Sequence, residues 1–199
     1  MSPDMPRRCC KGDVVLGSVI KINTPFTKEM ARQLKAGDSV EISGVIYTAR
    51  DAAHKKLTAL LEEGKELPFD IRDQIIYYVG PCPARPGMII GSAGPTTSGR
   101  MDAYAPRLIG SGLTGMIGKG LRSPEVVEAM KEHGAVCFGA TGGAGALLSK
   151  CIVSQEVTAF PELGTEALRK LVVENFPAVV VIDCNGNDLY ITGRAKFKI

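Results

Sequence analysis

The chain has 199 residues, of which 45% are hydrophobic and 23% are charged, and its formal net charge at pH 7 is +3. This length and composition suit one globular domain with its own core and exclude an intrinsically disordered protein. The small net charge, without a long Lys/Arg block, gives no reason to expect nucleic acid as a partner. No stretch reaches the ~18 consecutive apolar residues of a membrane span, and no secretory signal is apparent at the start, so neither a membrane nor export is expected.

Frequent Gly and Pro residues predict many short elements rather than long helices. In the first half of the chain, β-branched or alternating apolar residues predict strands at residues 13–22, 38–47, 74–79 and 88–92. Apolar residues at helical spacing predict helices at residues 27–34 and 51–63. We expect Thr27 to cap the first helix and Gly64 to end the second.

In the second half, a helix is predicted at residues 100–109, and Pro106 would kink or shorten it. An N-cap, a proline and an acid at residues 123–125 predict a helix that runs to His133 and ends at Gly134. Strands are predicted at residues 113–117, 135–139, 153–160, 168–174 and 178–183, and a short helix is predicted through Leu147 and Leu148.

The dipeptide at residues 185–186, Asn-Gly, predicts a hairpin whose second strand is residues 189–192. Strands and helices interleave along the chain, and its last third is rich in strands. This order favours a layered α/β domain with a mixed sheet. We expect an N-terminal arm at residues 1–23 and one main domain at residues 24–199.

Six cysteines are scattered along the chain, at Cys9, Cys10, Cys82, Cys137, Cys151 and Cys184. None of them forms a Cys-x-x-Cys pair, although a metal cluster needs thiolates that converge. We therefore expect no metal ligand from this chain. Without an export signal, we also expect reduced thiols in the cytoplasm.

Residues 88–104 contain the most informative pattern. A predicted buried strand leads into a loop with Pro95 and three hydroxyl residues, and Arg100 then begins a helix. Such a loop directs backbone N–H groups and hydroxyls towards an anion, and a guanidinium can hold a carboxylate through two hydrogen bonds. A structural helix cap would use the same hydroxyl residues, so the loop can be interpreted either as an anion-binding site or as a helix cap.

Two glycine-containing segments resemble nucleotide-binding loops but lack parts of the pattern. Around Lys119, Leu113 replaces the first glycine of a phosphate loop and Gly120 replaces its Ser/Thr. In the turn at residues 139–145, Leu148 replaces the last glycine of a dinucleotide fingerprint. For this turn we expect close packing, or a helix N-terminus facing the same anion, rather than NAD.

Several runs together resemble one family, the class I (iron–sulfur) fumarases and L-tartrate dehydratases. Residues 94–100 (GPTTSGR) are similar to the signature of the family's β domain, residues 47–54 (YTARDAAH) to a second signature, and residues 118–120 (GKG) to a third. Residues 160–166 and 176–181 are more similar to the fumarase branch. The resemblance covers nearly the whole expected main domain.

The resemblance implies a β/β/α swivelling-type domain with a mixed sheet, which closes over a cluster-bearing domain. It implies that the cofactor is a [4Fe–4S] cluster held by a partner α subunit, in a hetero-oligomer such as α2β2. One iron of that cluster would bind the substrate as a Lewis acid. The implied reaction is the reversible dehydration of (S)-malate, a small dicarboxylate, to fumarate in the cytoplasm.

Carried onto this sequence, the resemblance implies that Arg50, Arg100 and Lys119 hold the carboxylates of the substrate. It also implies that Thr96 removes the proton from the carbon beside a carboxylate. A free hydroxyl is too weak a base at neutral pH, so Thr96 would need nearby cations that stabilise its alkoxide, or a relay through a carboxylate. We expect His54 to lie on a solvated helix face or to be a first-turn partner of Arg50 rather than to be catalytic.

Two further functions stay open. The same cations suit the β subunit of an L-tartrate dehydratase, whose dicarboxylic substrate has one more hydroxyl. A stand-alone anion-binding module could also have kept the pocket without a catalytic partner.

Overall fold

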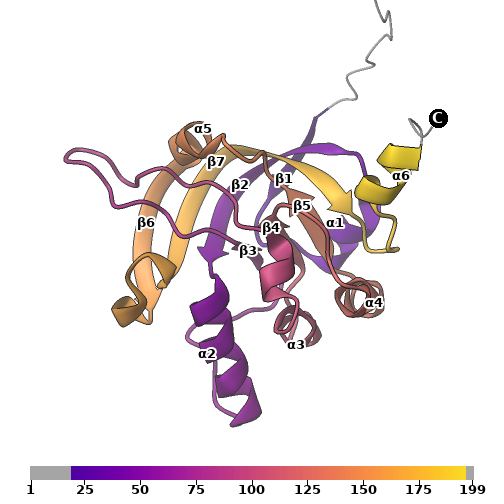
Figure 1. Ribbon diagram of the computed structural model, residues 1–199, viewed down its shortest axis with the longest axis horizontal. Coiled ribbons are helices and arrows are strands. Elements are labelled where there is room, and N and C mark those ends of the chain that lie inside the picture. The colour runs from indigo at the N-terminus through magenta and orange to yellow at the C-terminus, as the bar shows by residue number, and fades with distance from the viewer. Residues whose placement is uncertain (1–18, 196–199) are drawn as a thin grey trace, which may run out of the picture.

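One mixed sheet of seven strands organises the computed structural model, which describes residues 19–195 (Figure 1). The strands are β1 (Ile20–Asn23), β2 (Ser39–Thr48), β3 (Ile75–Tyr77), β4 (Gly115–Gly118), β5 (Val136–Gly139), β6 (Ile152–Ala159) and β7 (Leu168–Ile182). The α-helices are α1 (Lys28–Gln33), α2 (Asp51–Glu62), α3 (Ala105–Gly110), α4 (Pro124–His133), α5 (Gly145–Leu148) and α6 (Leu189–Ala195). Short 3-10 helices are η1 (Ser98–Met101), η2 (Ser149–Cys151) and η3 (Pro161–Glu166). The expected α/β class with a mixed sheet is confirmed.

The order of the strands closes part of the sheet on itself. Strands β1 to β5 pair in parallel with their neighbours in chain order. The long strand β7 runs antiparallel to β2 along most of its length and also pairs with β5 and β6. Because β7 contacts both β2 and β5, the ladder β2-β3-β4-β5-β7 returns to its start, so the sheet has an enclosed face and an outer face.

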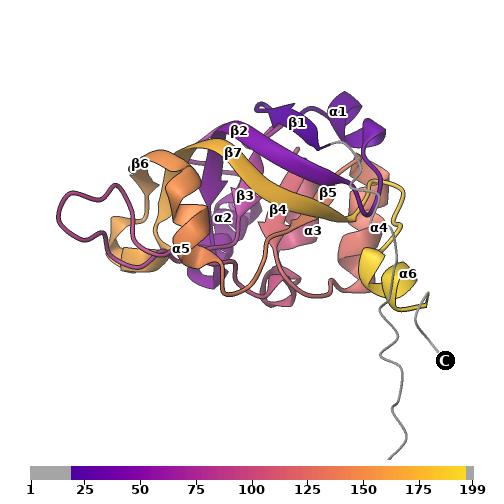
Figure 2. The ribbon, with the colours of Figure 1, turned by 90° about the horizontal axis from the view of Figure 1, so that it is seen from above.

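Each face of the sheet has its own hydrophobic core. One core contains the large side chains Ile42, Tyr77, Phe138, Phe176 and Val180. The other core lies between the sheet and α2, α3 and α4, and it includes Ile76, Met116, Leu57, Leu108 and Met130. Successive residues of β3 alternate between the two cores, as strand geometry requires. Figures 1 and 2 show α2, α3 and α4 on one side of the sheet, which gives the layered β/β/α arrangement.

Local signals placed most helices correctly. The Thr27 hydroxyl accepts a hydrogen bond from the Met30 N–H at 3.4 Å, which caps α1. Helix α4 ends at Gly134, whose φ of 76° is left-handed and suits glycine. The helix expected at residues 100–109 is divided into η1 and α3, because Pro106 lacks an N–H and is accommodated in the first turn of α3.

Two sequence-based expectations were wrong, and a third was incomplete. Residues 88–92 form no strand but part of the long loop after β3, where Met88 and Ile89 are 51% and 47% exposed. Residues 189–192 begin helix α6 rather than a second strand, because the Asp188 side chain accepts a hydrogen bond from the Tyr190 N–H at 2.7 Å and caps the helix. The predicted turn at residues 185–186 does form, and Ile182 and Asp188 pair across it in an isolated antiparallel bridge. The two strands expected at residues 168–174 and 178–183 are one continuous strand, β7.

Only the last residues of the expected N-terminal arm lie within the described part of the chain. These residues form β1, which pairs with β2, whereas residues 1–18 lie outside the described part of the chain. The boundary at residue 23 therefore stays a prediction.

None of the helices between residues 19 and 195 has both the length and the apolar character needed to cross a membrane.

The core beneath α2 predicts a contrast between two leucines. Leu57 is fully buried, whereas Leu147 on α5 is 65% exposed. We expect Leu57→Ala to lower the free energy of unfolding by about 2–5 kcal/mol, because it leaves a cavity. Leu147→Ala should change it by less than about 0.5 kcal/mol. Urea unfolding followed by circular dichroism measures both values, and equal losses would contradict this assignment of the core.

Candidate functional site

The predicted site residues follow the carboxyl ends of adjacent parallel strands. Arg50 follows β2, Lys119 follows β4, and the loop that carries Thr96 and Arg100 lies between β3 and α3. Parallel strands end at the same edge of a sheet, and ligands of α/β proteins bind at that edge. The topology therefore gathers at one edge residues that are up to 69 positions apart in the sequence.

Backbone hydrogen bonds anchor the loop to the ends of β3 and β4. The Thr96 N–H donates to the Tyr78 carbonyl at 2.7 Å, and the Thr96 carbonyl accepts from the Lys119 N–H at 3.2 Å. The Ser98 N–H then donates to the Lys119 carbonyl at 2.7 Å. These bonds fix partly buried Thr96 beside exposed Lys119, so the structure brings this pair of predicted site residues together.

The glycine-rich turn after β5 packs against the same loop. A Cβ atom on Gly145 would lie 2.8 Å from the Gly94 nitrogen, so this contact leaves no room for a side chain. A Cβ atom on Gly142 would lie 3.6 Å from Lys119 Nζ. The turn thus shows the close packing that we expected, and it lies beside the ammonium group.

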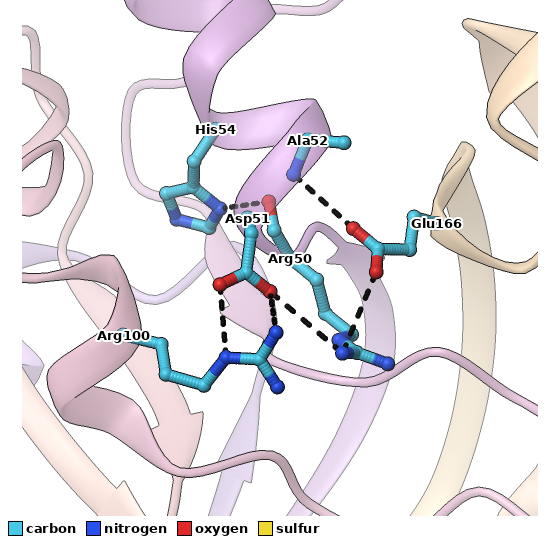
Figure 3. A network of polar contacts seen from close by, with 6 residues as sticks. All are labelled: Arg50, Asp51, Ala52, His54, Arg100 and Glu166. Carbon is cyan, nitrogen blue, oxygen red and sulfur yellow. Dashed lines mark hydrogen bonds and ion pairs between the residues drawn. The ribbon is translucent and has the colours of Figure 1, made fainter.

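Arg50 is held between two carboxylates at the start of α2 (Figure 3). Its Nη2 lies 3.4 Å from Glu166 Oε1 and 3.7 Å from Asp51 Oδ2. Glu166 also accepts a hydrogen bond from the Ala52 N–H at 3.1 Å, so it caps the helix as well. Gly80 makes room for the guanidinium, because a Cβ atom there would lie 2.7 Å from Arg50 Nη1.

Arg100 shares Asp51 with Arg50. Arg100 Nε donates to Asp51 Oδ1 at 2.9 Å, and Arg100 Nη2 lies 2.8 Å from Asp51 Oδ2. This is a two-point ion pair, and the Arg100 side chain is still 49% exposed. The structure therefore brings Arg50 and Arg100 together through one carboxylate, which Figure 3 shows between them.

His54 is buried rather than solvated. Its Nδ1 lies 3.0 Å from the Arg50 carbonyl, which can only accept, so Nδ1 donates. Burial lowers the pKa of His54 to about 4, so the ring is neutral at pH 7. The expectation of a solvated face was wrong, whereas the expected first-turn contact with Arg50 is confirmed.

A second ion pair beneath the site is absent from the sequence-based predictions. Arg122 has a fully buried side chain whose Nε donates to Asp102 Oδ1 at 2.7 Å. Its guanidinium lies over the Tyr78 ring, 5.4 Å from the centroid. Asp102 also accepts from the Ser123 N–H at 2.7 Å and so ties η1 to the start of α4. No sequence signal marks Arg122, because its burial depends on strand packing.

Asp51 and Glu166 were also absent from the predicted site. Asp51 lies inside the YTARDAAH run, which could have drawn attention to it, but its closest partner is 49 residues away. Glu166 lies 114 residues from the helix that it caps. The spacing of residues in the sequence predicts neither of these two contacts.

The described residues offer no ligand set for an iron–sulfur cluster. Between residues 19 and 195, no three His, Cys, Asp or Glu side chains converge to hold a metal ion. The cysteines in this range are free, at Cys82, Cys137, Cys151 and Cys184. The cluster that the resemblance implies therefore does not fit this part of the chain.

Comparison with known proteins identifies the family of the chain. The family described as Fumarase C-terminus matches residues 5–193. The anaerobic class I fumarate hydratase of Escherichia coli is 39% identical over 192 residues, which cover 94% of this chain and 34% of that protein. Fumarate hydratase 2 of Leishmania major is 41% identical over 177 residues, which cover 86% of this chain and 31% of that protein.

A third relative has nearly the same length as this chain. It is a putative L(+)-tartrate dehydratase subunit beta of Methanocaldococcus jannaschii, 38% identical over 171 residues, which cover 83% of this chain and 88% of that protein. In contrast, the chain spans about a third of the length of the fumarate hydratases that it matches. From the family match and these identities, we conclude that the chain belongs to the Fumarase C-terminus family, whose members include class I fumarate hydratases and tartrate dehydratase β subunits.

Proposed function

We propose that this chain is the β subunit of a [4Fe–4S]-dependent fumarate hydratase, a hydro-lyase that reversibly dehydrates (S)-malate to fumarate. The observation that carries the proposal is the pair Arg50 and Arg100, held close together by one carboxylate at the strand ends. Two guanidiniums gathered in this way suit an anionic ligand with two carboxylates. The names of the fumarate hydratase relatives support the same reaction.

A partner chain is part of this proposal. The fumarate hydratases are about three times as long as this chain, and the relative of similar length is named a subunit. We therefore propose that a separate α subunit supplies the remaining part and the [4Fe–4S] cluster, in an α2β2 complex in the cytoplasm. The exposed Arg100 and Lys119 would then form one wall of a shared site.

In this proposal the chain contributes binding and proton transfer. Arg50, Arg100 and Lys119 hold the two carboxylates of (S)-malate, and Thr96 removes a proton from the carbon beside one of them. The electrons of that C–H bond form the double bond while the hydroxyl leaves the adjacent carbon as hydroxide. The removed proton, passed on by Thr96, neutralises this hydroxide, so water and fumarate result. Thr96 is suited to this role because its backbone is anchored to Tyr78 and Lys119, and the nearby cations would stabilise its alkoxide.

One observation favours a second candidate, the β subunit of an L-tartrate dehydratase. The relative that has nearly the length of this chain is named for tartrate. Tartrate presents the same two carboxylates and one more hydroxyl, so the arginines would serve both substrates. Assays of the reconstituted complex on malate and tartrate side by side distinguish the two enzymes by the ratio of their kcat/KM values.

The isolated chain should fold but should not turn over malate. Both cores lie within residues 19–195, whereas this part of the chain offers no cluster ligands. Anaerobic purification, circular dichroism and a malate assay test this expectation. Co-expression with a cluster-bearing partner, followed by light scattering, should give an active complex; malate turnover by the isolated chain would contradict the shared site.

Arg100→Lys should weaken carboxylate binding by about 1.5–3 kcal/mol, because lysine keeps the charge but loses the two-point geometry. We expect this loss in KM and in kcat/KM for malate, with a further fall in kcat if the guanidinium also aligns the substrate. Arg72→Lys is the matched control, because Arg72 forms an exposed ion pair with Asp70 elsewhere. If Arg100→Lys has the same KM and kcat/KM for malate as the parent at equal iron content, Arg100 does not bind the substrate.

Thr96→Ala should lower kcat by about 10²–10⁴-fold with little change in KM, because it removes the proton acceptor and leaves the carboxylate contacts in place. Thr96→Ser keeps the hydroxyl and should retain much of the activity. Steady-state kinetics of both variants in the reconstituted complex measure the effect. If Thr96→Ala stays within a few-fold of the parent, Thr96 is not the base.

A further inference from the structure

Asp51 contacts both arginines that we propose as carboxylate ligands. It accepts from Arg100 Nε at 2.9 Å and lies 2.8 Å from Arg100 Nη2, and its Oδ2 is 3.7 Å from Arg50 Nη2. A carboxylate at this position can have one of two effects. It can compete with the substrate for the arginines, or it can orient them for the substrate.

The edge of Arg100 that Asp51 uses distinguishes these two effects. A guanidinium has five N–H donors, which form two edges that can each hold a carboxylate. Asp51 occupies the side edge, formed by Nε and Nη2. Within residues 19–195, no hydrogen bond or ion pair engages Arg100 Nη1, so the end edge formed by Nη1 and Nη2 can receive a second carboxylate.

The position of Asp51 is itself restrained by the fold. Asp51 is the first residue of α2, and the preceding carbonyl, that of Arg50, accepts from buried His54 at 3.0 Å. Glu166 holds the next N–H of the helix, that of Ala52. Figure 3 shows these contacts around one helix turn, so Asp51 can restrain the half-exposed side chain of Arg100 before any ligand arrives.

We propose that Asp51 is a positioning residue for dicarboxylate recognition. It fixes the plane of the Arg100 guanidinium and offsets the repulsion between Arg100 and Arg50, so that both guanidiniums face the ligand in one arrangement. Preorganisation of this kind raises affinity because less side-chain freedom is lost on binding. The inference rests on the proposed function, since it assigns Asp51 a role in that same site.

The direction of the effect of Asp51→Asn tests the inference. If Asp51 only competed with the substrate, loss of its negative charge would tighten the binding of a dianion. If Asp51 positions Arg100, the variant should raise the KM for malate and the Kd for succinate, a dicarboxylate that cannot be dehydrated, by about five- to thirtyfold. We expect kcat to change by less than this factor. Calorimetry and steady-state kinetics of the reconstituted complex measure these values.

Coupling to Arg100 separates positioning from a general loss of structure. In an Arg100→Lys background, Asp51→Asn should raise the Kd for succinate by a clearly smaller factor than in the parent, because the two-point pair is already lost and only the offset of charge remains. Asp51→Glu keeps the charge and should restore part of the affinity. The matched control is Asp70→Asn, since Asp70 holds Arg72 through the same pair of atoms, with Arg72 Nε 2.9 Å from Asp70 Oδ1 and Arg72 Nη2 2.6 Å from Asp70 Oδ2. This control should leave the Kd for succinate unchanged.

A nuclear magnetic resonance measurement on the isolated full chain provides a readout that needs no activity. The Nε–H resonance of Arg100 is identified by its loss in Arg100→Lys. It should shift and exchange faster with water in Asp51→Asn but not in Asp70→Asn. Circular dichroism verifies that each variant is folded.

The possible outcomes separate the inference from the proposed function. An active parent complex in which Asp51→Asn binds succinate as tightly as the parent, or more tightly, would overturn the positioning role alone. An effect of Asp51→Asn that persists undiminished in the Arg100→Lys background would also overturn it. A parent complex that neither binds succinate nor turns over malate would overturn both.

Discussion

The pairing of β7 with both β2 and β5 is the constraint on which the rest of the structure depends. It closes the ladder of parallel strands and gives the sheet two faces, each covered by its own core. The carboxyl ends of β2, β3 and β4 then meet at one edge. Because the residues after these strands are anchored by backbone hydrogen bonds, the site inherits its geometry from the sheet.

The balance of charge at this edge explains how several cations can lie together. Three cations gather at this edge: Arg50 follows β2, Lys119 follows β4, and Arg100 lies in the segment between β3 and α3. The carboxylates of Asp51 and Glu166 offset the repulsion between the two arginines. His54 adds no charge, because burial lowers the pKa of its ring to about 4. The arrangement leaves donors at the surface for an anion while the buried groups stay neutral or paired.

The difference in length between this chain and the fumarate hydratases offers a reason why the proposed site is exposed to solvent. The chain corresponds to about a third of the fumarate hydratases and to most of a tartrate dehydratase β subunit. In the proposed enzyme, a partner would cover the half-exposed side chain of Arg100 and exclude water. Electrostatic contacts strengthen when water is excluded, so closure would tighten the contacts of the arginines with the substrate.

Local sequence determined a large part of this protein. Capping residues such as Thr27 and Gly134 fix where helices begin and end, and the apolar patterns located most strands. The signatures of the family identified four candidate site residues, whose roles stay predictions: Arg50, Thr96, Arg100 and Lys119. Only the tertiary structure decided that Asp51 pairs with an arginine 49 residues away, that His54 is buried, and that residues 88–92 lie in an exposed loop. Caps and periodic patterns act within a few residues of the chain, whereas these features depend on which strands become neighbours, and that is settled by packing across the whole sheet.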